Sequence, residues 1–368
     1  MSIQTTSRCS KCLLPSTLPG SDFNTEGQCH WCQINFPNYV PEGEDKLIEV
    51  LEQHRNPGGS LDCLAGISGG KDSCYALLQL KNKYGMRVEA FTYVHEGMAE
   101  FAIENAKKLC RELEVKHHVV GLEDQAHLES FKAFFAAWLE AEEAVTAAMA
   151  CVACKHMFLL GVRLAQKIGA PTMVWASCPL EVPPFIPTVN KSRQDSKYKG
   201  MGDLALDLAH RVCTNHHFRQ AFWGNFSTCV FGCLAMKYRS GYMRVRYPSV
   251  KHLRFFQYYP WNEQEIIETL KQHTGWSIPD SVVCDWHSDC IFDIFKEYMY
   301  QKMLGVSYID AYLSNKIRYG LLTREAGWKE LVRIKGHYAD ELFKALEVLD
   351  LDHLRSKLDP SCFNITEG

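Results

Sequence analysis

Residues 67–73 read Ile-Ser-Gly-Gly-Lys-Asp-Ser, and the expected fold of the chain follows from this stretch and its surroundings. An apolar run at residues 61–67 is typical of a buried strand, and residues 74–83 have the composition of a helix. A glycine-rich turn between a strand and a helix suits phosphate binding, because the first amides of the helix have no partners inside it. The stretch therefore predicts an anion-binding loop at the end of a strand.

The side chains of this loop also suit a phosphate ligand. Gly69 and Gly70 let the backbone approach a ligand closely, because neither has a side chain. Ser68 and Ser73 offer hydroxyl groups, and Lys71 offers a positive charge. The pattern is shorter than a Walker A loop. It resembles the Ser-Gly-Gly-x-Asp-Ser signature of the PP-loop ATP pyrophosphatases, which cleave ATP between the α and β phosphates and leave a substrate oxygen adenylated.

Strands and helices alternate around the loop. Expected strands cover residues 61–67, 87–93, 116–121 and 172–176, and expected helices cover 44–54, 74–83, 99–113, 128–148 and 154–168. This alternation predicts an α/β fold with a doubly wound parallel sheet, which for a PP-loop enzyme is the adenine nucleotide alpha hydrolase-like fold. Such a sheet binds ligands beyond the carboxyl ends of its strands.

The loop is expected to meet other strand ends at that edge of the sheet. The residues expected to border the adenine of ATP are the strand-end residues Thr92, Tyr93, Val94 and Ala176. Glu96 and Glu181 follow the same strands and are candidate ligands for Mg²⁺ on the phosphates, although solvated acidic side chains are common in such loops. The PP-loop resemblance implies that Ser68, Gly69, Gly70, Lys71, Asp72 and Ser73 bind the phosphates, with Lys71 and Asp72 acting in catalysis.

Composition restricts the class of protein. The 368 residues carry a formal net charge of −3, which gives no overall bias toward nucleic acid. No apolar stretch reaches the roughly 18 residues of a membrane span, and no cleavable leader is evident, so a cytoplasmic protein is expected. The 16 cysteines would then be reduced thiols, and are expected to be metal ligands, catalytic groups or core residues.

Four cysteines near the amino terminus have the spacing of a zinc ribbon. Cys9 and Cys12 form one Cys-x-x-Cys pair, and Cys29 and Cys32 form a second after a spacer of 16 residues. Four thiolates would make a closed, structural Zn²⁺ site. We therefore expect a zinc ribbon in residues 1–40, a PP-loop nucleotide-binding domain in 41–182, and a substrate-binding, mostly helical region in 183–368.

A further Cys-x-x-Cys pair, Cys151 and Cys154, precedes an expected helix. Such a pair can be a redox site, half of a metal site or two core residues. Its possible partners are Cys229, Cys233 and Cys290. Three thiolates can hold an iron–sulfur cluster with one open iron, and four can close a zinc or cluster site. Cys151 and Cys154 are thus candidate catalytic and metal-binding residues.

The carboxyl-terminal half is less regular. Residues 190–202 are polar and basic, and are expected to form either a lid over an anionic substrate or a solvated loop. From residue 218 onward, arginines alternate with aromatic residues that can stack RNA bases or sugar rings, or simply fill a core. Helices are expected at residues 292–304, 308–319, 323–332 and 338–349.

Several separated motifs together resemble the N-acetyl sugar amidotransferase family of PP-loop enzymes. Besides the loop, they are residues 8–15 (Arg-Cys-Ser-Lys-Cys-Leu-Leu-Pro), 27–32 (Gly-Gln-Cys-His-Trp-Cys), 151–156 (Cys-Val-Ala-Cys-Lys-His), 259–262 (Tyr-Pro-Trp-Asn), 285–290 (Asp-Trp-His-Ser-Asp-Cys) and 312–320 (Tyr-Leu-Ser-Asn-Lys-Ile-Arg-Tyr-Gly). The resemblance spans nearly the whole chain but is weak over residues 178–250, where sugar recognition is expected.

This resemblance implies a specific reaction. ATP would activate an oxygen of a nucleotide-linked or lipid-linked N-acetyl sugar, and ammonia from a separate glutaminase subunit would displace AMP to form an amidine. Bacterial surface polysaccharide synthesis would be the setting. The resemblance also makes Cys290 the best third partner for Cys151 and Cys154.

Two other functions remain open on the sequence. The additional cysteines at positions 178, 213, 229 and 233 bring the chain toward the iron–sulfur-dependent PP-loop tRNA thiolases, in which an adenylated carbonyl accepts sulfur. The reaction would then be the thiolation of tRNA or a small heterocycle, and the partners would be a sulfur donor and tRNA. Alternatively, the chain is a non-catalytic zinc-ribbon module that binds a nucleotide or nucleic acid without turnover.

Overall fold

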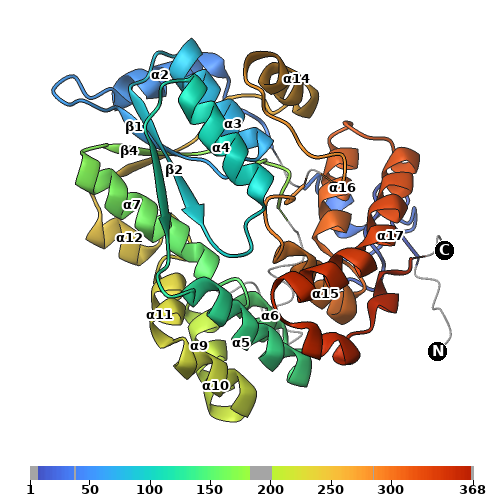
Figure 1. Ribbon diagram of the computed structural model, residues 1–368. Coiled ribbons are helices and arrows are strands. Elements are labelled where there is room, and N and C mark those ends of the chain that lie inside the picture. The colour runs from blue at the N-terminus through green and yellow to red at the C-terminus, as the bar shows by residue number, and fades with distance from the viewer. Residues whose placement is uncertain (1–6, 37–38, 183–200, 285, 366–368) are drawn as a thin grey trace.

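The computed structural model of the protein describes residues 7–36, 39–182, 201–284 and 286–365. Its centre is a five-stranded sheet with the order β3-β2-β1-β4-β5, in which all neighbouring strands are parallel. The strands are β1 (Cys63–Gly66), β2 (Val88–Val94), β3 (His117–Gly121), β4 (Thr172–Trp175) and β5 (Lys251–Arg254). The predicted α/β fold with a parallel sheet is confirmed (Figure 1).

Both faces of the sheet are buried, as in a doubly wound fold. Cys63 and Ala65 pack in the cluster that contains the apolar residues of α3 (Lys71–Leu78) and α4 (Glu100–Glu112). Leu64, between them in the sequence, packs with α7 (His156–Ile168) on the opposite face. Because successive side chains of a strand point to opposite faces, helices must cover both sides of this sheet. Figure 1 shows α3 and α4 on one side and α7 on the other.

The expected helices of the first half are present, with one break. Helix α2 covers Glu44–His54 as predicted, and a π-helical turn (Gln79–Lys83) extends α3. The expected helix at 128–148 is two helices, α5 (Ala126–Ala141) and α6 (Ala144–Met149), because Glu142 between them has a left-handed φ of 44°. A 3₁₀ turn (Ala153–Lys155) then leads into α7.

The second half of the chain returns to the sheet, which the sequence analysis did not predict. After α9 (Met201–Thr214), α10 (His216–Gly224), α11 (Phe226–Leu234) and α12 (Gly241–Arg246), β5 pairs with β4 at the edge of the sheet. The remaining helices are α13 (Phe255–Tyr258), α14 (Glu263–His273), α15 (Asp293–Leu304), α16 (Tyr308–Arg318) and α17 (Arg324–Val348), followed by 3₁₀ turns at Asp352–Lys357 and Pro360–Phe363. Helix α17 replaces the two helices expected at 323–332 and 338–349.

The amino-terminal cysteine segment, which includes α1 (His30–Gln33), packs on the carboxyl-terminal helices. Its buried cysteines share an apolar cluster with Tyr300 and Val306. Arg8 forms a buried ion pair with Asp310 of α16 (Nη1 to Oδ1, 2.8 Å). Segments from the two ends of the chain therefore lie together beside the parallel sheet, as the blue and red ribbons show in Figure 1. Within the described residues, no helix is both long and apolar enough to cross a membrane.

Candidate functional site

The loop after β1 is shaped by its own serine side chains. The Ser73 hydroxyl accepts a hydrogen bond from the Ser68 amide (3.1 Å) and donates one to the Gly70 carbonyl (3.1 Å). The Ser68 hydroxyl accepts from the Gly70 amide (3.3 Å). These bonds fold the loop around the amino terminus of α3, where the free amides of the first turn carry a partial positive charge.

Gly69 allows the loop to lie directly against α4. Its φ is +87°, and an added Cβ would lie 1.8 Å from the Ala102 carbonyl oxygen. Its own carbonyl accepts a hydrogen bond from the Trp276 indole (2.9 Å). Only glycine fits this position, because both the backbone conformation and the contact exclude a side chain.

Lys71 and Asp72 begin α3 and are held by residues from the other half of the chain. The Trp261 indole donates to Asp72 Oδ1 at 2.7 Å. The Lys71 ammonium lies 3.5 Å from Glu263 Oε1. Glu263 Oε2 in turn pairs with Lys316 of α16 at 2.5 Å. Two positive charges and one carboxylate therefore lie beside the loop after β1.

The Glu263 carboxylate is ionised within this group. Burial alone would raise its pKa, but Lys71 and Lys316 outweigh that effect and hold the pKa below its ordinary value. The Tyr312 hydroxyl also donates to Glu263 Oε1 (3.0 Å). A carboxylate that pairs with two lysines keeps both of them charged and close to the loop.

Asp72 also belongs to a group of possible metal ligands. Ligand atoms of Asp72, Cys178 and Glu181 all lie within 4.8 Å of one another. Burial, together with the charge of Asp72, raises the pKa of Glu181 to about 8. The two carboxylates suit Mg²⁺, which prefers oxygen ligands and shares them with nucleotide phosphates; the Cys178 thiol is too soft a ligand for it. Glu96, the other expected magnesium ligand, is not in this group among the described residues.

A cavity of about 420 Å³ opens at the carboxyl ends of the strands. Ser68 and Ser73 line it on the side of the loop, and Tyr93 and Ala176 line it at two other strand ends, as the sequence analysis expected. Thr92 does not line the cavity, since its hydroxyl contacts His117 Nε2 at 2.7 Å. Val94 is also outside the lining.

Cys151, Cys154 and Cys290 line the same cavity. The segment of Cys290 is fixed to the loop after β2, because Ala99 donates its amide to the Asp289 carbonyl (2.9 Å) and Ile291 donates to the Gly97 carbonyl (2.7 Å). Contact with Cys154 lowers the pKa of Cys151 to about 7, although burial opposes this. The three thiols therefore line the cavity together with the loop after β1 and the strand ends.

The other candidate partners do not reach this cavity. Cys229 is fully buried in the main core, and Cys233 packs against that core. Neither lines the cavity, so both behave as small apolar core residues. The lid expected at 190–202 lies largely outside the described residues, which resume at 201.

Several residues of the site were missed by the sequence analysis. His127 of α5 lies 3.4 Å (Nε2) from the Cys154 sulfur and 3.0 Å (Nδ1) from the Tyr93 hydroxyl. Lys296 of α15 lines the cavity and pairs with Asp293. Lone residues of these types carry no local signal, and the only available hint was the motif at 259–262 that contains Trp261.

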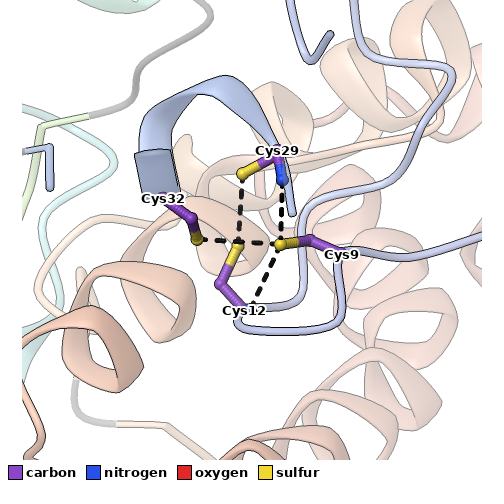
Figure 2. A group of neighbouring side chains, drawn as sticks. All are labelled: Cys9, Cys12, Cys29 and Cys32. Atoms are coloured by element: carbon purple, nitrogen blue, oxygen red, sulfur yellow. Dashed lines mark hydrogen bonds between the residues drawn. The ribbon is translucent and has the colours of Figure 1, made fainter. Parts of the chain in front are cut away.

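The four amino-terminal cysteines converge as expected for a zinc ribbon. All are buried, and their sulfurs lie within 4.8 Å of one another (Figure 2). The Cys9 and Cys32 sulfurs are 3.6 Å apart, and the Cys12 and Cys29 sulfurs are 3.7 Å apart. A tetrahedral ion with Zn–S bonds of about 2.3 Å requires sulfurs about 3.8 Å apart. The group therefore fits a metal such as zinc.

Comparison with known proteins agrees with this geometry. Residues 62–182, which contain the loop, the four strands β1 to β4 and the Cys151 pair, match the family model of the queuosine biosynthesis protein QueC. The chain contains a PP-loop domain. Residues 62–182 thus have the adenine nucleotide alpha hydrolase-like fold of the PP-loop superfamily.

One curated relative is an uncharacterized protein of Methanocaldococcus jannaschii, 30% identical over 112 residues. The match covers 29% of this chain, and the chain spans only 40% of the length of that relative. The similarity is thus confined to part of each protein.

Similar solved structures are synthetases and a thiolase, all at 14% sequence identity. NMN synthetase from Francisella tularensis has a TM-score of 0.37, with 86% of this chain and 94% of that chain covered. The U34-tRNA thiolase NcsA from Methanococcus maripaludis, solved with a 4Fe–4S cluster, has a TM-score of 0.30 and 86% coverage of both chains. The ammonia-dependent NAD synthetase from Campylobacter jejuni has a TM-score of 0.29, with coverage of 56% and 96%.

Proposed function

We propose that the protein adenylates an oxygen of an N-acetyl sugar and that ammonia then displaces AMP, as in an N-acetyl sugar amidotransferase. One observation carries this proposal: motifs of the resemblance that lie far apart in the sequence meet at the PP-loop. Trp261 contacts Asp72, and Glu263, just after that motif, contacts Lys71. Lys316, from the motif at 312–320, joins them through Glu263.

The residues suit the first step of this reaction. The acceptor oxygen attacks the α phosphorus of ATP, the bond from that phosphorus to the bridging oxygen breaks, and pyrophosphate leaves. Lys71 and the amides at the start of α3 are placed to stabilise the charge on the leaving pyrophosphate. Asp72 and Glu181 would hold the Mg²⁺ that neutralises the phosphates.

In the second step, ammonia attacks the activated carbon. The carbon–oxygen bond to AMP then breaks, so that AMP departs with the former acceptor oxygen and an amidine remains. The acceptor would be a nucleotide-linked or lipid-linked N-acetyl sugar, and the ammonia would come from a separate glutaminase subunit. The cavity supports this order of steps, because Ser68 and Ser73 of the loop line it together with residues of the strand ends.

An isotope experiment tests this reaction. The protein is incubated with ATP, Mg²⁺, ammonium and an N-acetyl sugar nucleotide whose acetyl oxygen carries a heavy-oxygen label. We expect pyrophosphate, an amidine product and AMP that contains the label. Unlabelled AMP would rule out activation of that oxygen, and nucleotide binding without any AMP would favour a non-catalytic binding module.

Sulfur transfer is the second candidate, and the three thiols of the cavity favour it. Among the described residues, Cys151, Cys154 and Cys290 do not form a group whose ligand atoms all lie within 4.8 Å of one another. Cys151 and Cys154 contact each other, so Cys290 lies farther from at least one of them than the ligands of a single ion would. Such a set fits an iron–sulfur cluster, whose iron atoms each take one thiolate. A cluster held there would supply an open iron for a sulfur donor, and tRNA would be the acceptor.

Metal analysis and a change of nucleophile separate the two candidates. For nitrogen transfer, protein purified without oxygen should contain zinc alone, and ammonium rather than sulfide should yield product. Stoichiometric iron and sulfide that disappear in Cys151→Ala, with product formed from sulfide, would favour sulfur transfer. The matched control Cys233→Ala removes a thiol that lies outside the cavity.

A further inference from the structure

A second cavity, of about 470 Å³, lies at the edge of the sheet. It is beside the cavity at the carboxyl ends of the strands, which we name the adenylation cavity after its proposed function. The carboxyl end of α2, the segment at 238–239, α12, and β5 with the residues before it form its walls. Three cations line it, Arg239, Arg244 and Lys251, together with His54 and His252. No acidic residue is among the residues that line it, so its surface is cationic.

The charge of this region is not balanced locally. Residues 208–262 contain no aspartate or glutamate, although the whole chain is slightly acidic. Within the described part of the chain, none of the ion pairs includes Arg239, Arg244 or Lys251. Cations that line a concave site without acidic partners are suited to a ligand with several negative charges.

The second cavity adjoins the first, and residues of the two cavities contact each other. Tyr238 lines both cavities. His252 lies on the same face of β5 as Arg254, since they are two residues apart on a strand, and Arg254 lines the adenylation cavity. The Trp175 indole, which also lines that cavity, donates to His252 Nδ1 at 3.1 Å. Two residues of a strand span roughly 7 Å, so a ligand of about that length would reach from His252 in the second cavity to Arg254 in the first.

We propose that this cationic cavity binds the diphosphate of the acceptor, while the reacting end of the acceptor passes Tyr238 into the adenylation cavity. Arg239 and Arg244 would bind phosphate oxygens through their planar guanidinium groups, and Lys251 as a point charge. The half-buried ring of Tyr238 offers a flat surface for the group attached to the diphosphate. The ligand class is a diphosphate ester, which is shared by nucleotide-linked and lipid-linked sugars, and this assignment of the reacting end rests on the proposed function.

Calorimetric titration tests the site without requiring turnover. The PP-loop of the full-length protein is first saturated with α,β-methylene ATP and Mg²⁺, and uridine diphosphate, farnesyl diphosphate or a single-stranded RNA is then added. We expect a diphosphate ester to bind at this second site, and Arg244→Met and Lys251→Met each to weaken it by about tenfold. Arg219→Met, which removes an exposed cation of the same acid-free segment outside the cavity, should bind as the unmodified protein does.

Each result of this titration either supports or overturns the proposed diphosphate site. Preference for uridine diphosphate or for farnesyl diphosphate would support the site and identify the source of the diphosphate. Binding that disappears once the PP-loop is saturated, or that ignores both cavity variants, would overturn it. The proposed site would also be overturned if RNA bound more tightly than the diphosphates and Arg219→Met weakened RNA binding as much as the cavity variants do. That pattern is expected of an extended basic surface. The titration measures binding and involves no step of catalysis. A negative result would therefore overturn the diphosphate site without deciding the outcome of the isotope experiment.

Discussion

Trp261 donates its indole N–H to a carboxylate oxygen of Asp72 at 2.7 Å, although the two residues are 189 positions apart in the sequence. Both side chains are buried. Asp72 is in the first turn of α3, next to Lys71, whereas Trp261 precedes α14. The bond therefore ties the carboxyl-terminal half of the chain to the loop that gives the PP-loop domain its chemistry.

Replacement of Trp261 by phenylalanine should weaken this link while it keeps most of the packing. Loss of a hydrogen bond to a buried carboxylate costs about 1.5–3 kcal/mol. We expect Trp261→Phe to raise the KM for ATP by roughly tenfold or more. Trp223→Phe, an exposed indole on α10, is the matched control and should leave this KM unchanged. An unaltered KM in Trp261→Phe would mean that the bond does not position Asp72.

The parts of the site that were predicted from the sequence depend on short segments. The residues of the loop at 67–73 are adjacent in the sequence, and the four amino-terminal cysteines lie in two Cys-x-x-Cys pairs. Their spacing in the sequence was therefore sufficient to predict both features. Strands β1 to β4 were found because they are short apolar runs between helical segments. Strand β5 was missed, because an exposed edge strand reading Lys-His-Leu-Arg contains only one buried residue.

The rest of the site arises from contacts that no local pattern encodes. Glu263 and Lys316 would each be assigned to a solvated helix surface from the sequence, and only packing of α14 and α16 brings them to Lys71. Lys335 gives a second example. It lies between the helices expected at 323–332 and 338–349, yet it is buried within α17, where Asp310 and Gln301 accept its protons at 2.5 and 2.6 Å.

Lys316 is expected to keep Glu263 from competing with ATP. Without Lys316, the Glu263 carboxylate would pair only with Lys71 and would repel the phosphates. We expect Lys316→Met to weaken ATP binding by about tenfold, and the double variant with Glu263→Gln to recover most of that loss. Binding of ATP to the single and double variants by calorimetry measures this coupling. Strictly additive effects would show that the two residues act independently, and Lys329→Met provides an exposed control on α17.

Gly69 is expected to tolerate no side chain. The Cβ of Gly69→Ala would meet the Ala102 carbonyl oxygen at 1.8 Å, so either the loop or α4 must move. We expect a loss of stability of at least about 2 kcal/mol and a strong loss of ATP binding. Gly336→Ala is the control, because it lies exposed on α17 with no atom within 4 Å of the new Cβ and should stabilise by about 0.5–1 kcal/mol. Thermal unfolding of both variants checks the contrast.

The role of Lys71 in AMP formation should be independent of metal binding by the four amino-terminal cysteines. The ribbon packs on α15 and α16, and Arg324 at the start of α17 donates to the Cys9 and Cys12 carbonyls, whereas the PP-loop follows β1. We expect Lys71→Ala to lower AMP formation by at least about 100-fold with its zinc content unchanged. Cys12→Ser should lose zinc and lower the melting temperature, since the metal stabilises a segment with few apolar residues. Normal AMP release by folded Lys71→Ala would contradict the role given to this lysine.

Glu297 of α15 should make the stability of the protein depend on pH. It is 1% exposed, one of its oxygens has no hydrogen-bond partner, and burial raises its pKa from the ordinary 4.5 to about 8. Between these two values the folded protein keeps a proton that the unfolded chain has lost. The free energy of unfolding therefore falls as pH rises through this window, by up to about 1.4 kcal/mol per pH unit. Glu297→Gln cannot titrate, so denaturant unfolding from pH 5 to pH 8 should show a smaller decline in this variant than in the unmodified protein. Glu268→Gln, a change on the exposed face of α14, should follow the unmodified profile, and parallel profiles for all three proteins would exclude a neutral, buried Glu297.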